Sequence, residues 1–286
     1  MALENPGAVG KFRLGGVVGD TLSFIGRNPV LALAVAVCFF VLPSLLSALL
    51  TFAYRERAAF LVGGGRVEPF SVAVYVGFLL VAGLLGALPS FLGHAVLSKA
   101  VLEDANGHSP SIARCVQSAL HCLVPMLGIG LTIYLLWFCA QQAVVAARLV
   151  FPTFGGGVAF ILAVVPSIVW VLGSLAAVPV AMREGLGATA SIRRSRTLTK
   201  GHRWPIFGLF LIVFVLVLAL RMGFVLGFDF ALMAAPLSIV VVNATANGAI
   251  TGIAWLLASV IATTTYIALR RVKEGGGVDE LVDVFS

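Results

Sequence analysis

The sequence predicts an all-α, polytopic membrane helix bundle with about six transmembrane helices, in a single domain that covers residues 1–286. Three observations predict it. Hydrophobic residues make up 60% of the chain and charged residues only 11%, whereas a soluble domain carries about 25% charged residues. Six apolar stretches are long enough to cross a bilayer, and their cationic ends gather on one side. A soluble fold of this length could not bury so much apolar surface.

Each predicted span is an apolar stretch that holds no Asp, Glu, Lys or Arg except Arg221 in the fifth. A helix needs about 20 such residues to cross a hydrocarbon layer of about 30 Å. The six stretches cover residues 29–53, 70–97, 123–147, 158–182, 205–228 and 237–269. The first exceeds the roughly 7–15-residue apolar core of a signal peptide, so we expect it to be retained. Apolar residues do not alternate with period two, which excludes transmembrane strands.

Four prolines lie inside the predicted spans, at Pro43, Pro89, Pro166 and Pro179. Neighbouring helices and waters can satisfy the carbonyl groups that a proline frees within a bundle. We therefore expect kinks at these positions and no breaks.

Lysine and arginine gather on one side of the predicted bundle. Fourteen of the 19 lie in the terminal segments and in the connections after even-numbered spans, four lie on the opposite side, and Arg221 lies within a span. Cytoplasmic segments of membrane proteins carry this excess of positive charge. The sequence therefore predicts that both the N-terminus and the C-terminus are cytoplasmic.

Three units of similar order follow one another along the chain. Each even-numbered span ends near an acidic residue and a glycine, at residues 103–107, 184–185 and 274–275, and each odd-numbered span opens with a proline. We interpret this order as three repeats of an amphipathic surface helix and a transmembrane hairpin. The repeats cover residues 10–107, 108–187 and 188–286. The alternative is convergence, because any span that ends at a membrane face tends to finish with charge and glycine.

The first two surface helices carry apolar stripes at helical spacing. The stripe of the first consists of Leu14, Val17, Val18, Thr21, Leu22 and Ile25. The stripe of the second consists of Ile112, Cys115, Val116, Ala119 and Leu120. Helices of this kind lie in the headgroup plane with the apolar face toward the lipid.

The third surface helix carries a basic stripe instead, made of Arg193, Arg196, Lys200 and Arg203. Anionic lipid attracts such residues by about 1 kcal/mol each. We expect the stripe to contact anionic headgroups, a protein partner or a second copy of the chain. The alternative is ordinary charge that sets the topology. Nucleic-acid binding is not expected, because the patch is small and holds no interleaved aromatic residue apart from Trp204.

No constellation for catalysis or metal binding is found in the sequence. Four cysteines and four histidines are scattered over separate elements, and no HExxH, P-loop or GxSxG motif occurs. The sequence predicts a protein that is not an enzyme and that needs no cofactor or metal.

Polar residues inside the spans form a second candidate site. Arg221 lies about 24 Å along the fifth span from Pro205. Its expected companions are Gln141, Gln142, Asn243 and Asn247. An intramembrane ionisable residue indicates function by default, so these residues predict an outward-facing polar pocket. The alternative is that Arg221 snorkels to the outer interface and that the amides join helices by hydrogen bonds.

The surface-helix and hairpin unit, the stretch SIRRSRTLTKGHRW at 191–204 and the tail from 266 to 285 resemble a bacterial family. It is the membrane domain named after glycerophosphoryl-diester phosphodiesterases, together with related uncharacterised multi-spanning proteins. In the enzymes of that name a separate soluble barrel carries the catalysis, and this chain has no room for one. The resemblance implies a bacterial inner-membrane protein and transfers no catalytic residues.

Two functions follow as hypotheses. The first is a non-enzymatic membrane module that contacts lipid or a partner through its cytoplasmic amphipathic helices. The alternative is a transporter or permease component with the polar pocket around Arg221, which the internal repetition favours. An intramembrane lipid enzyme ranks last, because no nucleophile and base are paired in the sequence.

Overall fold

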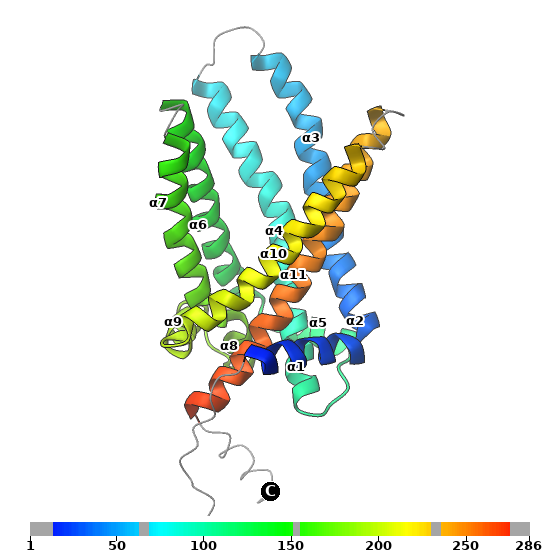
Figure 1. Ribbon diagram of the computed structural model, residues 1–286, viewed down its shortest axis with the longest axis vertical. Helices are drawn as coiled ribbons and strands as arrows, with labels where there is room; N and C mark the ends of the chain where they lie inside the picture. Colours follow the sequence, from blue (N-terminus) through cyan, green and yellow to red (C-terminus); the bar gives the residue numbers. More distant parts are fainter. Residues whose placement is uncertain (1–13, 63–68, 151–154, 230–235, 275–286) are drawn as a thin grey trace, which may run out of the picture.

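The structure, a computed structural model, describes residues 14–62, 69–150, 155–229 and 236–274. Every regular element in these ranges is a helix (Figure 1), which confirms the predicted all-α class. Six helical stretches are long and apolar enough to cross a membrane. They are Pro29–Thr51, Val74–Ala105, Leu123–Ala147, Pro166–Glu184, Arg203–Phe224 and Ala244–Glu274. The chain is therefore a membrane-embedded, multi-pass helix bundle.

The long helices form three hairpins. The first joins α3 (Leu42–Val62) to α4 (Pro69–Ala105), the second joins α6 (Leu123–Val150) to α7 (Gly155–Ser174), and the third joins α10 (Arg203–Asp229) to α11 (Pro236–Glu274). The first span begins with α2 (Pro29–Val35) and the π-helical segment η1 (Ala36–Val41), which lead into α3. Figure 1 shows the second hairpin on one side of the bundle and the first and third on the other, diverging toward the upper end.

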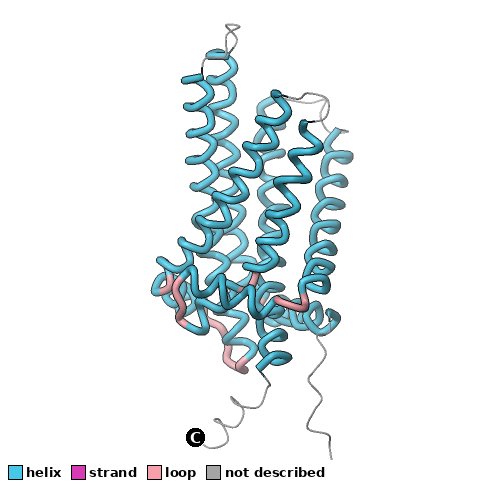
Figure 2. The backbone as a smooth tube through the Cα atoms, turned by 90° about the vertical axis from the view of Figure 1, so that its left-hand side faces the viewer, coloured by secondary structure: helices cyan, strands magenta, loops and turns pink. Residues whose placement is uncertain are grey.

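Four short helices gather at the lower end, here called the basal end (Figures 1 and 2). They are α1 (Leu14–Arg27), α5 (Ile112–His121), α8 (Ala177–Glu184) and α9 (Ala188–Thr199). The chain order places α1, α5 and α9 each before one hairpin, as a threefold repeat requires. The equivalence of the three units in detail stays a prediction.

The fourth span differs from the sequence prediction of kinks without breaks. Its helix ends at Ser174 and resumes as α8 at Ala177. Pro179 has no N–H to donate, and its ring crowds the carbonyl four residues earlier, at Leu175. Pro89 and Pro166 lie inside continuous helices. One of the four prolines thus accompanies an interruption, for which another element must supply hydrogen bonds.

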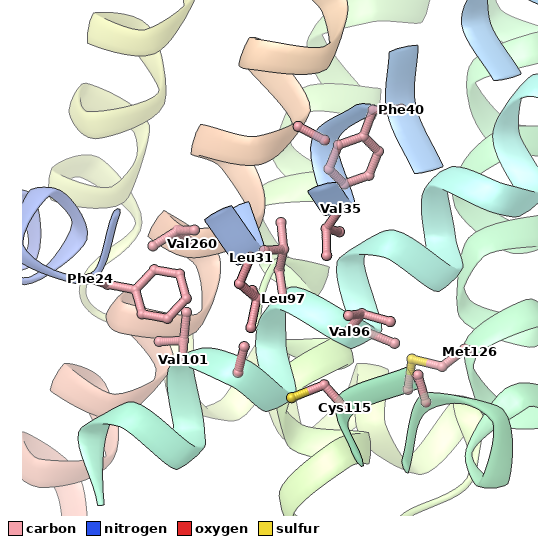
Figure 3. Packing of buried hydrophobic residues seen from close by; sticks show 14 of the residues in the cluster. Phe24, Leu31, Val35, Phe40, Val96, Leu97, Val101, Cys115, Met126 and Val260 are labelled. Atoms are coloured by element: carbon pink, nitrogen blue, oxygen red, sulfur yellow. The ribbon is translucent and has the colours of Figure 1, made fainter. Parts of the chain in front are cut away.

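The hydrophobic core lies toward the basal end, where α1, α4, α5, α6 and α11 meet (Figure 3). Its members include Phe24 of α1, Val101 of α4, Cys115 of α5, Met126 of α6 and Val260 of α11, all nearly inaccessible. Because one core is shared by all three units, the basal helices are part of the bundle and are not loose appendages.

Candidate functional site

Ion pairs tie the ends of the spans to the basal helices. Arg27 at the end of α1 contacts Asp104 at the end of α4, with Nη2 and Oδ2 2.5 Å apart. Asn28 donates from Nδ2 to Asp104 Oδ1 over 3.1 Å. The hydrogen bond and the negative charge of Asp104 raise the pKa of Arg27. This contact fixes where α1 meets the second span.

A larger charge cluster surrounds Arg194 of α9. Its Nε lies 3.2 Å from Glu184 at the end of α8, and its Nη2 contacts Glu274 at the end of α11. Arg270 also donates to Glu274 over 2.8 Å, and the Tyr266 hydroxyl donates to Glu184 over 3.1 Å. Burial acts to lower the pKa of Arg194, but the two carboxylates outweigh it and raise the pKa.

The acidic residues that the sequence singled out before glycines thus have a defined role. In the first unit Asp104, in the second Glu184 and in the third Glu274 each accept an ion pair at the basal end. Asp104 and Glu274 pair with arginines 77 and 80 residues away, on α1 and α9, whereas Glu184 pairs with Arg194 on the next helix. These acidic residues form ion pairs between the basal end of a span and a short basal helix.

Glu103, the neighbour of Asp104, contacts α5. Its carboxylate lies 3.9 Å from the Cys115 sulfur, and it pairs with Lys99 over 3.8 Å. Burial, reinforced by the charge of Glu103, raises the pKa of Cys115 to about 11. The thiol therefore stays protonated at neutral pH and is poorly nucleophilic.

Helix α9 also supplies hydrogen bonds to the backbone at the interruption between α7 and α8. Ser195 Oγ accepts a hydrogen bond of 3.0 Å from the Ala176 N–H and donates one of 2.8 Å to the Gly173 carbonyl. These are backbone groups that the interrupted helix leaves open. Ser195 is completely buried, so α9 is docked into the bundle and does not only rest on it.

The structure separates the four members of the predicted basic stripe. Arg193, Lys200 and Arg203 have exposed side chains at the basal end. The guanidinium of Arg196 instead lies over the Trp170 ring of α7, 5.0 Å from its centroid. Three of the four cations are therefore available to a headgroup, while the fourth packs on the fourth span.

Apolar side chains accompany these cations. Trp204, which follows Arg203, is 84% exposed. On α1, Val17, Thr21 and Phe24 are buried. A second stripe on that helix remains exposed, made of Leu14, Val18 and Leu22. Helix α1 thus packs one face against the bundle and leaves a second, apolar face exposed.

Sequence reasoning assigned no role to a polar row between α4 and α11. His94 Nδ1 contacts Ser259 Oγ, and Thr263 Oγ1 lies 3.0 Å from Ser98 Oγ. The second contact lies four residues after the first on both helices, which is about one helical turn. The sequence contains a signal for this row, because each of the two apolar spans carries two polar residues at positions i and i+4. That spacing places the two residues on the same face of a helix.

Unusual backbone surrounds this row. Segment η1 packs against α11 and α4, and π-helical segments are frequent at functional sites. The Ser90 hydroxyl donates to the Phe39 carbonyl of η1 over 3.3 Å. A Cβ at Gly93 would lie 2.6 Å from that of Phe39, and one at Gly252 would lie 2.5 Å from Val41 Cγ2. Glycine is required at both positions for the close approach.

The structure describes the side chains of four of the five residues in the predicted Arg221 set. Gln141 on α6 is exposed and Gln142 half-buried, Asn247 on α11 is half-buried, and Arg221 on α10 is exposed. The side chain of Asn243 lies outside the described residues. Helices α6 and α10 share no extended contact in the described structure, and their upper parts lie on different sides in Figure 1. A shared pocket therefore stays a prediction that the described contacts do not favour.

The described residues offer exposed cations and apolar side chains at the basal end and one imidazole between two spans. No group of three or more His, Cys, Asp or Glu side chains that could hold a metal ion occurs in the described ranges. Comparison of the chain with protein-family models, with curated proteins and with solved structures found no match. The resemblance seen in the sequence therefore transfers nothing to these sites.

Proposed function

We propose that this protein is a non-enzymatic membrane module of the bacterial inner membrane, held at its basal face on anionic lipid headgroups. The observation that carries the proposal is the group of exposed cations Arg193, Lys200 and Arg203 beside the exposed indole of Trp204. Cations bind phosphate oxygens, and indole rings favour the same headgroup level. The resemblance to the multi-spanning family supports the bacterial assignment.

The in-plane placement of α1 supports the same conclusion. Its exposed stripe of Leu14, Val18 and Leu22 is apolar, and the opposite face is tied to α11 through Thr21, whose Oγ1 lies 3.2 Å from that of Thr264. A helix with one apolar face on the protein and another toward the surroundings fits the boundary between acyl chains and headgroups. The basal end therefore presents both an apolar and a cationic contact to one leaflet.

The test uses Trp204 as a reporter of its own lipid neighbours. In vesicles at low salt, brominated phosphatidylglycerol should quench Trp204 emission more than brominated phosphatidylcholine does. The Trp204 contribution is the difference between the wild type and Trp204→Phe. Replacing Arg193, Lys200 and Arg203 together by Gln should lower the relative affinity for the anionic lipid by roughly 10–100-fold, at about 1 kcal/mol per cation less salt screening.

The matched control is Arg221→Gln, which removes an exposed cation far along α10 from Arg203. It should leave the quenching ratio at Trp204 unchanged. An unchanged ratio in the folded triple variant would contradict the proposal, because the basal cations would then select no headgroup.

Orientation is a separate part of the proposal. We infer that the basal end faces the cytoplasm, since it carries most of the lysine and arginine residues. Reporter fusions at the two termini should both be active in the cytoplasm. Activity of the two fusions on opposite sides of the membrane would contradict six crossings.

A further inference from the structure

His94 lies in the membrane-spanning part of the bundle. Its apolar span continues for three residues to Leu97, and the first charged residue on the basal side is Lys99, about 7 Å from His94 along the helix axis. The imidazole therefore lies within the apolar span, toward its basal end. An ionisable side chain at that depth is a functional candidate by default.

The hydrogen bonds around Ser259 define which ring nitrogen is the base. The Ser259 hydroxyl has one hydrogen, and it donates to the Trp255 carbonyl over 2.6 Å. With that hydrogen on the carbonyl, the oxygen accepts from His94 Nδ1. We assign this arrangement, in which the lone pair of the neutral ring is on Nε2. Protonation at Nε2 needs no change at Ser259.

Aromatic rings stand where a counter-charge would be needed. The Trp255 ring meets the His94 ring edge-on with centroids 5.0 Å apart, and the Phe40 ring lies 5.6 Å away. The two rings have interplanar angles of 88° and 58° to the imidazole. An imidazolium at His94 would thus have two aromatic neighbours.

The titratable groups on the helices packed against α4 are engaged elsewhere or point outward. On α4 itself Lys99 pairs with Glu103, which also meets Cys115 of α5. Tyr134 of α6 donates to the Leu80 carbonyl, Tyr54 of α3 stacks on Phe78, and Cys38 of η1 is exposed. Glu184 of α8 binds both Arg194 and Tyr266 of α11. Among the described residues, no carboxylate therefore pairs with His94 as a fixed counter-ion.

Hydroxyl groups continue from His94 toward the basal end along α11. Thr263 Oγ1 lies 3.0 Å from the Ser259 carbonyl, one turn below His94, and the Tyr266 hydroxyl reaches Glu184. Thr265 Oγ1 is also fully buried and finds no hydrogen-bond partner in the described part of the chain, but two residues after Thr263 it lies on another face of α11.

We propose that His94 is an intramembrane proton-binding site, taking a proton at Nε2 and exchanging it with the basal face along the hydroxyl groups of α11. The step adds one proton to a neutral imidazole, gives an imidazolium between Trp255 and Phe40, and breaks no bond. It lies outside the lipid contact proposed above, since none of its residues belongs to the basal cations.

Trp255 is the reporter for the test, because a neighbouring imidazolium changes indole emission. The protein carries Trp137→Phe, Trp170→Phe and Trp204→Phe, so that only Trp255 emits. In vesicles, lowering the pH from about 8 to about 3, a window that brackets ordinary and shifted histidines, should give one titration step. His94→Gln should abolish the step, and the control His121→Gln, an exposed position on α5, should retain it.

A step that persists in His94→Gln would overturn the proposal, and so would the absence of any step in the window. Nitrogen-15 NMR of labelled histidine in the otherwise native protein keeps the test valid if a variant misfolds. The neutral His94 should show a protonated Nδ1 and a bare Nε2, and the opposite tautomer would overturn the assignment of the base. After a rapid pH jump on the basal side, Thr263→Val should relax several-fold more slowly than the wild type. An unchanged rate would overturn the route along α11.

Discussion

Helices α10 and α11 form one hairpin, yet they have opposite surroundings. In the most apolar part of α10, 11% of the residues are buried, compared with 56% in α11. Helix α10 is nevertheless the one with the higher mean hydropathy. Its large side chains, such as Ile212, Phe214 and Val215, remain exposed. A soluble protein would show the reverse arrangement, with its most hydrophobic helix in the centre.

The difference shows which solvent the chain is built for. Lipid is as apolar as leucine, so burying a leucine against another helix gains little. Small residues permit close packing and hydroxyls supply hydrogen bonds, and α11 provides both through Gly252, Ser259, Thr263 and Thr264. Small and hydroxyl-bearing residues of α11 therefore share the interior with the hydrophobic core, while the large apolar residues of α10 remain exposed.

The largest difference in stability between α10 and α11 is expected when a glycine on each helix is replaced by a large residue. A Cβ at Gly252 of α11 would lie 2.5 Å from Val41 Cγ2 and 3.8 Å from the Ala36 carbonyl. Gly252→Leu should cost more than about 3 kcal/mol, the upper range for overpacking. Gly223→Leu on α10, where a Cβ meets nothing within 4 Å, should be harmless. The measurement is the melting temperature in detergent, and equal losses would show that α10 is covered.

A second test compares the two ends of α10. Leu209 is 1% exposed and contacts the Val17 and Ile261 cluster, whereas Leu216 is exposed. Leu209→Ala should destabilise the bundle by about 2 kcal/mol, since the site cannot fully collapse. Leu216→Ala should change stability by only a few tenths. Denaturation in mixed micelles measures both, and a large effect at Leu216 would indicate a partner on that face.

The ion pairs of Arg194 with Glu184 and Glu274 are expected to have a third, smaller effect on stability. Arg194→Gln leaves Glu184 without its charged partner and removes one of the two partners of Glu274. We expect a loss of about 1–2 kcal/mol, because the carboxylates are only partly buried. The neighbouring exposed Arg193→Gln is the control and should be neutral. Stability that does not depend on Arg194 would show that α9 is held by Ser195 alone.

The smallest expected effect concerns the hydroxyl pair between α1 and α11. Thr264→Val removes the contact to Thr21, whose Oγ1 lies 3.2 Å away. Interhelical hydrogen bonds of this kind contribute about 0.6 kcal/mol on average. The control is Thr132→Val on α6, where the exposed hydroxyl bonds only to its own helix at Gly128. Hydrogen exchange at the amides of α1 should rise in the first variant only.

The spans could be predicted from the sequence because length and composition alone define them. The acidic positions at Asp104, Glu184 and Glu274 also carried a signal, since each stands near the end of a span. Their arginine partners could not be predicted, because Arg194 joins two units through contacts 10 and 80 residues away. Sequence spacing does not reveal such contacts.

The interior site was missed for a different reason. His94 is one histidine in a long apolar span, and its meaning depends on Ser259 lying at the same height 165 residues later. The two residues come into contact because α4 and α11 pack side by side in the same direction. The Arg221 set was drawn from similar depths on separate helices, so its convergence on one pocket stays a prediction.

The hydrogen bonds of Ser195 have a consequence for biosynthesis. Gly173 and Ala176 obtain their partner from a residue 22 and 19 positions later. Ser195 reaches these groups only when the helix that follows the fourth crossing folds back against it, so until then the open amide and carbonyl have no partner within the span. Stable insertion of this crossing is therefore coupled to docking of α9.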